Sequence, residues 1–183
     1  MKKTIKAYIC FVIFSSSSFA QSVIEKKLLI NFDGLCVQNI NKLISIVDFA
    51  KSNNWKQIPP GKDALVAPQV KGSLYQAYGF KDEGSMLMIA INNAENTNTC
   101  SMASTYSDIS YIKKTLNEFY QLKLVKNISQ GIQTTEVYSA NLIQSPKAMI
   151  VLTYGTQPSI NVVSISVIKN LWTNIQSLPG KQV

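Results

Sequence analysis

The sequence SINVVSISVI, residues 159–168, alternates apolar and polar side chains along most of its length. Val163, Ile165 and Val167 occupy every second position, and Ser164 and Ser166 stand between them. Successive side chains of a β-strand point to opposite faces of the sheet, so this pattern predicts a strand with one buried face and one face in water. Such strands are typical of antiparallel sheets.

Other strand-like segments precede this one, and short turn signals separate the last three. Ser145-Pro146 and Gln157-Pro158 flank the apolar segment 147–155. Connections this short favour antiparallel hairpins. The predicted strands cover residues 73–80, 85–91, 99–106, 132–142, 147–155 and 159–168.

Two segments instead have the three- and four-residue apolar spacing of an amphipathic helix. The first runs from Val37 to about Asn53 and ends before Trp55, and the second covers residues 109–120, with Ser107 or Asp108 as its N-cap. Residues 21–31 are compatible with either a strand or a short helix. The apolar positions of the two helices are Val37, Ile40, Leu43, Ile44, Val47 and Ala50, then Ile109, Ile112, Leu116, Phe119 and Tyr120.

Hairpins grouped apart from helices predict an α+β fold. We expect an antiparallel sheet of about five to six strands with two helices packed on one face, in the order α-βββ-α-βββ. The two halves share this order but no sequence identity at a fixed register, so an internal repeat is only weakly indicated.

The first 20 residues have the order of a secretory signal peptide: lysines, an apolar run over residues 7–14, serines, and Ala20 before the cleavage point. The apolar run is shorter than the roughly 20 residues that span a bilayer. We therefore predict residues 1–20 as the leader and 21–183 as a single exported domain, periplasmic or, alternatively, secreted. Cys10 would leave with the leader, and no later segment reads as a transmembrane span.

Two cysteines, Cys36 and Cys100, remain after the leader. An even number in an oxidising compartment favours a disulfide between them, with free thiols or intermolecular pairing as alternatives. The chain has no histidine, which a catalytic thiol would use as its base and a zinc site as a ligand. We therefore expect no metal and no cofactor.

All 18 basic residues are lysine. Without the leader, 15 lysines face 10 acidic residues, a net charge of about +5. The lysines are spread along the chain, and the arginine fork that contacts phosphate and guanine is absent. The composition therefore argues against nucleic-acid binding.

Familiar catalytic motifs are also absent from the sequence. We find no GxSxG turn, no phosphate-binding loop and no dinucleotide fingerprint. The acidic residues stand mostly in predicted turns or on the outer faces of helices, where we expect solvated or capping roles. They are Glu25, Asp33, Asp48, Asp63, Asp82, Glu83, Glu95, Asp108, Glu118 and Glu136.

An export leader, a cysteine that opens a helix, a tryptophan at its end and a second cysteine after an asparagine-rich turn form one pattern. The residues that carry it are Leu35-Cys36-Val37, Ala50, Trp55 and Thr99-Cys100. This pattern, over roughly residues 32–106, resembles small uncharacterised periplasmic proteins of Gram-negative bacteria. The resemblance implies an exported, disulfide-bonded protein and adds no catalytic residue.

These observations favour a non-catalytic exported protein that binds a protein or another envelope component, in its most specific form an immunity or inhibitor protein. Exposed sheet surface or a strand edge would be the contact site. One alternative is a hydrolase of envelope substrates, which needs two acids that converge in one pocket. A second is a self-associating structural or assembly protein.

Overall fold

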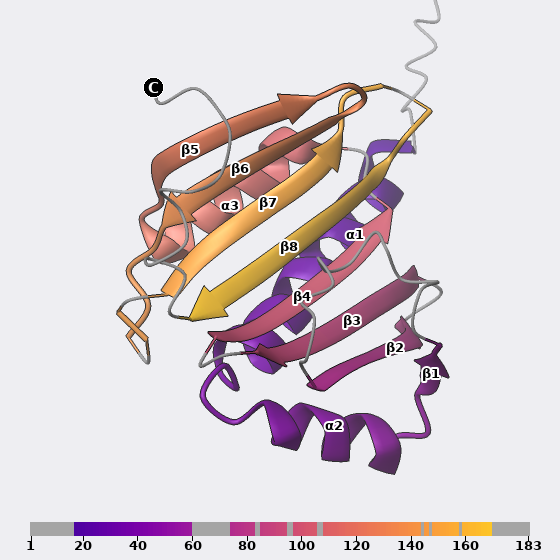
Figure 1. The fold of residues 1–183 in the computed structure, drawn as a ribbon. Helices are drawn as coiled ribbons and strands as arrows, with labels where there is room; N and C mark the ends of the chain where they lie inside the picture. The colour runs from indigo at the N-terminus through magenta and orange to yellow at the C-terminus, as the bar shows by residue number, and fades with distance from the viewer. Residues whose placement is uncertain are drawn as a thin grey trace, which may run out of the picture.

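A computed structural model describes residues 17–59, 74–82, 85–94, 97–105, 108–143, 145–146, 148–157 and 159–169. In these residues one antiparallel sheet packs against helices (Figure 1). The helical elements are α1 (Ser17–Asn31), the π-helical segment η1 (Phe32–Val37), α2 (Leu43–Ser52) and α3 (Ile109–Tyr120). The strands are β1 (Lys56–Ile58), β2 (Leu74–Asp82), β3 (Ser85–Ala94), β4 (Thr97–Thr105), β5 (Lys123–Gln130), β6 (Gln133–Ser139), β7 (Ala148–Gly155) and β8 (Val162–Lys169).

The predicted fold, a sheet of about five to six strands with two helices in the order α-βββ-α-βββ, is wrong. The described chain has eight strands and three α-helices, and four strands follow α2 and four follow α3. The strands that were missed are β1 and β5. β1 has only three residues directly after a helix, and most side chains of β5 are exposed, so neither has a clear apolar alternation.

The strand order is β1-β2-β3-β4-β8-β7-β6-β5, and every neighbouring pair is antiparallel. Each half of the chain is therefore a four-stranded meander, and the last strands of the two meanders pair at the centre of the sheet. There Ser101 of β4 lies opposite Ser166 of β8, and their buried hydroxyls are 2.7 Å apart. From either edge to the centre, the strands follow one another in chain order, β1 to β4 from one side and β5 to β8 from the other.

This central position explains why one expectation for β8 was wrong. Val163, Ile165 and Val167 are fully buried, but Ser164 and Ser166 are also buried, at 6% and 9% exposed. A strand in the middle of a wide sheet has neighbours on both sides, and its small serine side chains leave little surface to water. The alternation therefore marks two buried faces of different polarity.

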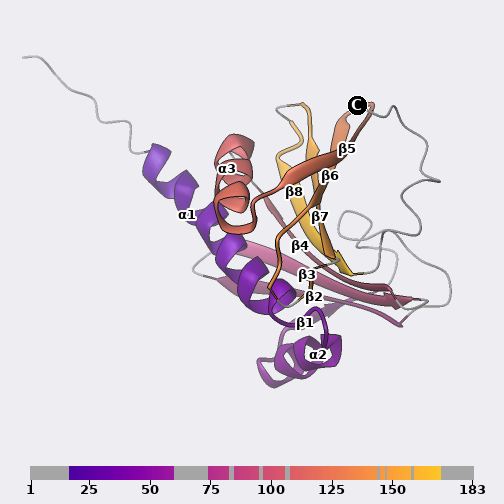
Figure 2. The ribbon, with the colours of Figure 1, turned by 90° about the vertical axis from the view of Figure 1, so that its left-hand side faces the viewer.

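Figure 2 shows α1 and α3 together on one face of the sheet, whereas α2 lies near the β1 end. Asp108 caps α3 by accepting hydrogen bonds from the backbone N–H groups of Ser110 and Tyr111. The main core lies between the helices and the sheet. Its largest fully buried side chains are Phe32, Leu28, Ile40, Ile46, Leu87, Ile89, Met102, Ile112, Leu116, Ile150 and Leu152.

The helix predicted from Val37 to about Asn53 is interrupted. The side-chain amide of Asn39 donates to the carbonyl oxygens of Gly34 and Leu35, both at 3.0 Å, and Ser45 donates to Asn39 at 3.0 Å. Such side-chain hydrogen bonds compete with the helical ladder. The first helix consequently ends at Val37, and α2 begins at Leu43.

Residues 1–16 of the predicted leader lie outside the described residues. The predicted cleavage point after Ala20 falls near the start of α1, so cleavage there would leave the helix from Gln21 onward. Within the described residues no helix is both long enough and apolar enough to cross a membrane.

Candidate functional site

The predicted cysteine pair is present as a disulfide. Cys36 of η1 and Cys100 of β4 are bonded, their Cα atoms are 5.3 Å apart, and both residues are fully buried. Cys36 lies in the last turn of the α1–η1 unit, not at the head of the helix predicted from Val37 to about Asn53. The bond attaches the helical layer to a central strand, and neither sulfur is available for catalysis or metal binding.

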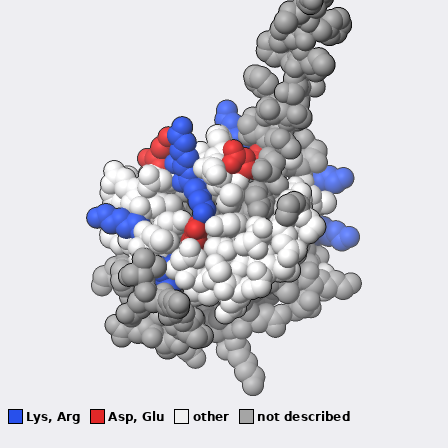
Figure 3. Space-filling model, turned by 90° about the horizontal axis from the view of Figure 1, so that it is seen from above, with Lys and Arg blue, Asp and Glu red and all other residues white. Residues whose placement is uncertain are grey.

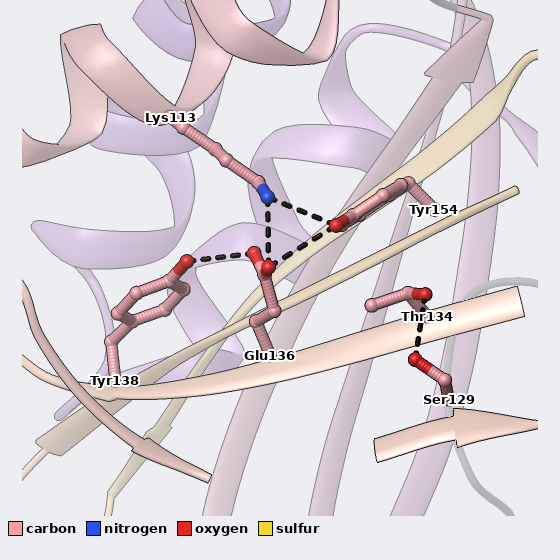
Figure 4. A network of polar contacts seen from close by, with 6 residues as sticks. All are labelled: Lys113, Ser129, Thr134, Glu136, Tyr138 and Tyr154. Atoms are coloured by element: carbon pink, nitrogen blue, oxygen red, sulfur yellow. Dashed lines mark hydrogen bonds and ion pairs between the residues drawn. The ribbon is translucent and has the colours of Figure 1, made fainter. Parts of the chain in front are cut away.

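A buried carboxylate at the α3 side of the sheet was not predicted as a site. Glu136 of β6 is 6% exposed and accepts three hydrogen bonds: from Lys113 at 2.8 Å, from Tyr138 at 2.7 Å and from Tyr154 at 3.1 Å. The Lys113 ammonium also donates to the Tyr154 hydroxyl at 2.9 Å (Figure 4). The local sequence does not mark it as a site, because Lys113 of α3 and Tyr154 of β7 reach Glu136 only in the folded chain.

The electrostatics of this network are those of a satisfied ion pair. Burial alone lowers the pKa of an ammonium, but the hydrogen bonds to Glu136 and Tyr154 outweigh it and raise the pKa of Lys113. Burial, together with the hydrogen bond to Glu136, raises the pKa of Tyr138. Both carboxylate oxygens of Glu136 accept hydrogen bonds within the network. Since Lys113 belongs to α3, Glu136 and Tyr138 to β6 and Tyr154 to β7, the network holds α3 against these two strands like a polar clamp.

The remaining acids do not form a cluster in the described residues. Glu25 of α1 is 1% exposed and accepts a hydrogen bond from the backbone N–H of Asp108 at 3.2 Å, so it is not the solvated residue that was expected. Asp82 lies 3.3 Å from Lys27. In the part of the chain that the structure describes, no three His, Cys, Asp or Glu residues could jointly hold a metal ion. Asp63, Glu83 and Glu95 lie outside the described residues.

One surface groove lies between the α1–η1 unit and α3, and we call it the interhelix groove. Its volume is about 430 Å³. Ile30 and Phe119 line it and are 57% and 73% exposed, so part of its wall is apolar surface in water. Charged residues of both signs, Lys26, Asp33 and Glu118, also line it.

The hydrolase alternative needs two acids in one pocket, and Asp33 and Glu118 both line the interhelix groove. Asp33 accepts a 2.6 Å hydrogen bond from the Tyr120 hydroxyl. The Glu118 side chain is 61% exposed and lies 3.9 Å from Lys114. A two-carboxylate hydrolase keeps one carboxyl in a water-poor environment, and Glu118 does not stand in one.

Another groove lies at the β1 end of the sheet, and we call it the β1-edge groove. Its volume is about 870 Å³. Trp55 and Phe80 form one wall, and their rings are stacked with centroids 3.9 Å apart and an angle of 5° between planes. Met86, which is 56% exposed, and the partly buried Met88 add flexible apolar surface.

Among the residues that the structure describes, the charged side chains that line the β1-edge groove have one sign. Lys56 and Lys81 are its charged lining residues, and both are exposed. Neither has a salt-bridge partner within the described ranges. By contrast, basic and acidic side chains are scattered among uncharged ones on the face that Figure 3 shows from above. The β1-edge groove therefore combines aromatic, thioether and cationic surface.

Comparisons of this chain with protein-family models, with curated proteins and with solved structures find no match. What can be said of its function therefore depends on its own residues.

Proposed function

We propose that this protein is an exported, non-catalytic binding protein that contacts a protein partner through the β1-edge groove. The observation that carries the proposal is the groove itself, which the Trp55–Phe80 stack and Met86 line together with two lysines that have no acidic partner among the described residues. Aromatic residues and methionine are enriched at protein interfaces. An exposed apolar surface rimmed by polar groups is typical of an interaction site.

The disulfide supports the compartment in this proposal. Disulfides persist in oxidising environments such as the periplasm and are rare in the cytosol. The Cys36–Cys100 bond is buried and joins two elements of the core, so it suits a folding role better than a redox cycle. The leader-like first 20 residues point to the same compartment.

The non-catalytic part of the proposal is supported by how the described polar groups are used. Glu136 is held by three hydrogen bonds, and Asp33 accepts one from Tyr120. An immunity or inhibitor protein, which binds and blocks an enzyme delivered to the periplasm, is the most specific form of this function.

The test is capture of a partner from periplasmic extract by the tagged protein, followed by mass spectrometry. We expect one protein to be recovered in stoichiometric amount and absent from bare resin. Repeated recovery of nothing but a second copy of the chain would favour self-association, and sedimentation of the purified protein would then show a concentration-dependent mass. Either that result or the absence of any stoichiometric protein would contradict the proposal.

A further inference from the structure

We propose that the β1-edge groove takes an extended acidic segment of the partner, which adds as a strand beside the last residues of β2. This inference rests on the proposed binding function and specifies the chemistry of the partner. It follows from the backbone at this edge, the shape of the groove floor and the sign of its charge.

The backbone leaves a vacant position along β2. β1 pairs only with residues 77–79 of β2, so in the described part of the chain residues 80–82 have no strand on their outer side. The chain leaves this line at Asn54, whose φ of 54° is in the left-handed region that asparagine tolerates better than most residues. An extended segment could therefore continue the line of β1 along β2 and pair with its backbone groups.

The floor of the groove has a gap at Gly79. Lys56 lies opposite Gly79 on one side and Met88 lies opposite it on the other, so these side chains share a face with no side chain between them. A Cβ atom placed on Gly79 would meet nothing closer than Ile58 Cδ1 at 3.7 Å, which is an ordinary contact. A Cβ atom is therefore accommodated at Gly79 in contact with Ile58, and the rest of a larger side chain would extend between Lys56 and Met88.

The two faces of the edge differ, and the difference predicts a pattern in the partner. Lys81 lies two residues after Gly79 on the same face as Lys56 and opposite Met86. The other face presents Phe80, with Trp55 stacked on it, and Asp82, whose carboxylate pairs with Lys27 of α1 at 3.3 Å. Side chains of an added strand would alternate between these faces. Acidic residues at every second position would then meet the lysines, and apolar residues between them would meet the aromatic rings.

Lysines on an edge strand can also serve to keep other strands away. The exposed Met86 argues for contact, because it leaves apolar surface in water that a strand would cover, and the partly buried Trp55–Phe80 stack adds aromatic surface on the other face of the same edge. The interhelix groove is less suited to an acidic segment, since Asp33 and Glu118 line it.

The experiment uses three acetylated and amidated octapeptides with a fluorescent label. In the first, Glu alternates with Val and Tyr. The second has the same composition with its Glu residues contiguous, and the third has Lys in place of Glu. The fluorescence polarisation of each peptide is measured at low salt as increasing amounts of the mature disulfide-bonded protein are added. We expect the alternating acidic peptide to bind at least about tenfold more tightly than the other two, and its affinity to fall as salt rises.

Variants then locate the site. Gly79→Val should fill the gap and weaken binding about tenfold or more while keeping the thermal midpoint, because valine is favoured in strands. The double variant Lys56→Glu/Lys81→Glu should weaken binding of the acidic peptide by a similar factor. Phe119→Ser, in the interhelix groove, is the matched control and should leave the affinity unchanged. Slower hydrogen exchange at the amides of residues 80–82 on binding would show that the peptide adds as a strand.

Equal affinity for the acidic and basic peptides would overturn the inference. So would an unchanged affinity in a folded Gly79→Val protein, or the absence of any change in exchange at residues 80–82. In each of these cases, recovery of a stoichiometric partner from periplasm would still support the binding function. Loss of both the peptide result and the partner would contradict the inference and the proposed function together.

Discussion

The hydroxyl of Tyr120, at the end of α3, donates a 2.6 Å hydrogen bond to Asp33 in η1. This bond joins the third helix to the π-helical segment that carries Cys36, so it lies between the two units that cover the sheet. Tyr120 is 9% exposed. Burial, with the hydrogen bond to Asp33, raises the pKa of Tyr120 above its usual value of 10.0.

The raised pKa predicts a loss of stability in alkali. Above pH 10 the Tyr120 hydroxyl ionises in the unfolded chain but stays protonated in the folded protein, so the unfolded state is favoured increasingly as pH rises. Below pH 10 this contribution is constant. We expect Tyr120→Phe to lower the free energy of unfolding by about 1–2 kcal/mol at pH 8 and to reduce its decline above pH 10. Urea unfolding from pH 8 to 11 measures both effects, and an unchanged decline would contradict the assignment.

The buried disulfide predicts a large loss of stability on its removal. A bond that closes a loop with a sequence separation of 64 contributes about 4 kcal/mol in the chain-entropy model. We expect the double variant Cys36→Ser/Cys100→Ser to lose about this much in urea unfolding, or not to fold at all. Thiol labelling of the unfolded protein without residues 1–20, which removes Cys10, should require a reductant, and labelling without one would contradict the bond.

The Glu136 network predicts that removal of the Glu136 charge lowers the stability of the protein more than removal of an exposed carboxylate does. In Glu136→Gln the Lys113 ammonium loses its counter-charge in a partly buried site, and we expect a destabilisation of about 1–3 kcal/mol. Glu118→Gln is the matched control, because the Lys114–Glu118 pair is largely exposed and worth less than about 0.5 kcal/mol. Equal effects of the two substitutions on thermal unfolding would show that the network does not clamp α3 to the sheet.

Two glycines predict opposite responses to alanine. A Cβ atom on Gly155, at the end of β7, would overlap the carbonyl oxygen of Ile160, whereas one on Gly34 would meet nothing within 4 Å. We expect Gly155→Ala to destabilise the protein by about 2 kcal/mol or more, since backbone must move. Gly34→Ala, in a helical segment, should be neutral or stabilising by up to about 1 kcal/mol. Comparison of the two midpoints in urea is the measurement, and a tolerated Gly155→Ala would contradict this packing.

The end of α3 predicts a stabilising substitution. Gln121 has a φ of 50°, in the left-handed region, where most residues other than glycine are strained by their Cβ atom. We expect Gln121→Gly to raise the free energy of unfolding by about 0.5–1 kcal/mol. Gln121→Ala retains the Cβ atom and serves as the control, so it should give no gain. A loss of stability in Gln121→Gly would show that the 3.5 Å contact from Asn141 to the Gln121 side chain matters more than the strain.

The sequence predicted local features better than their assembly. The Cys36–Cys100 disulfide and the helix that Asp108 caps follow from residue type and local spacing, and both are present. The number of strands could not be predicted, because β1 and β5 lie at the sheet edges and lack buried alternation.

Burial and grooves depended on contacts between distant segments. Ser166 appears solvated in the sequence but lies against Ser101, 65 residues away. Glu136 similarly acquires its partners from α3 and β7. The β1-edge groove forms because Asn54 turns the chain away from β2, and the Trp55–Phe80 stack beside that turn has no local sequence signal.

The most direct test of the account compares recovery of a partner from periplasmic extract by the wild-type protein and by Gly79→Val. The two proteins are first matched in disulfide content and thermal midpoint. We expect a stoichiometric partner with the wild-type protein and its loss with Gly79→Val. Equal recovery by both proteins, or no partner with either, would contradict it.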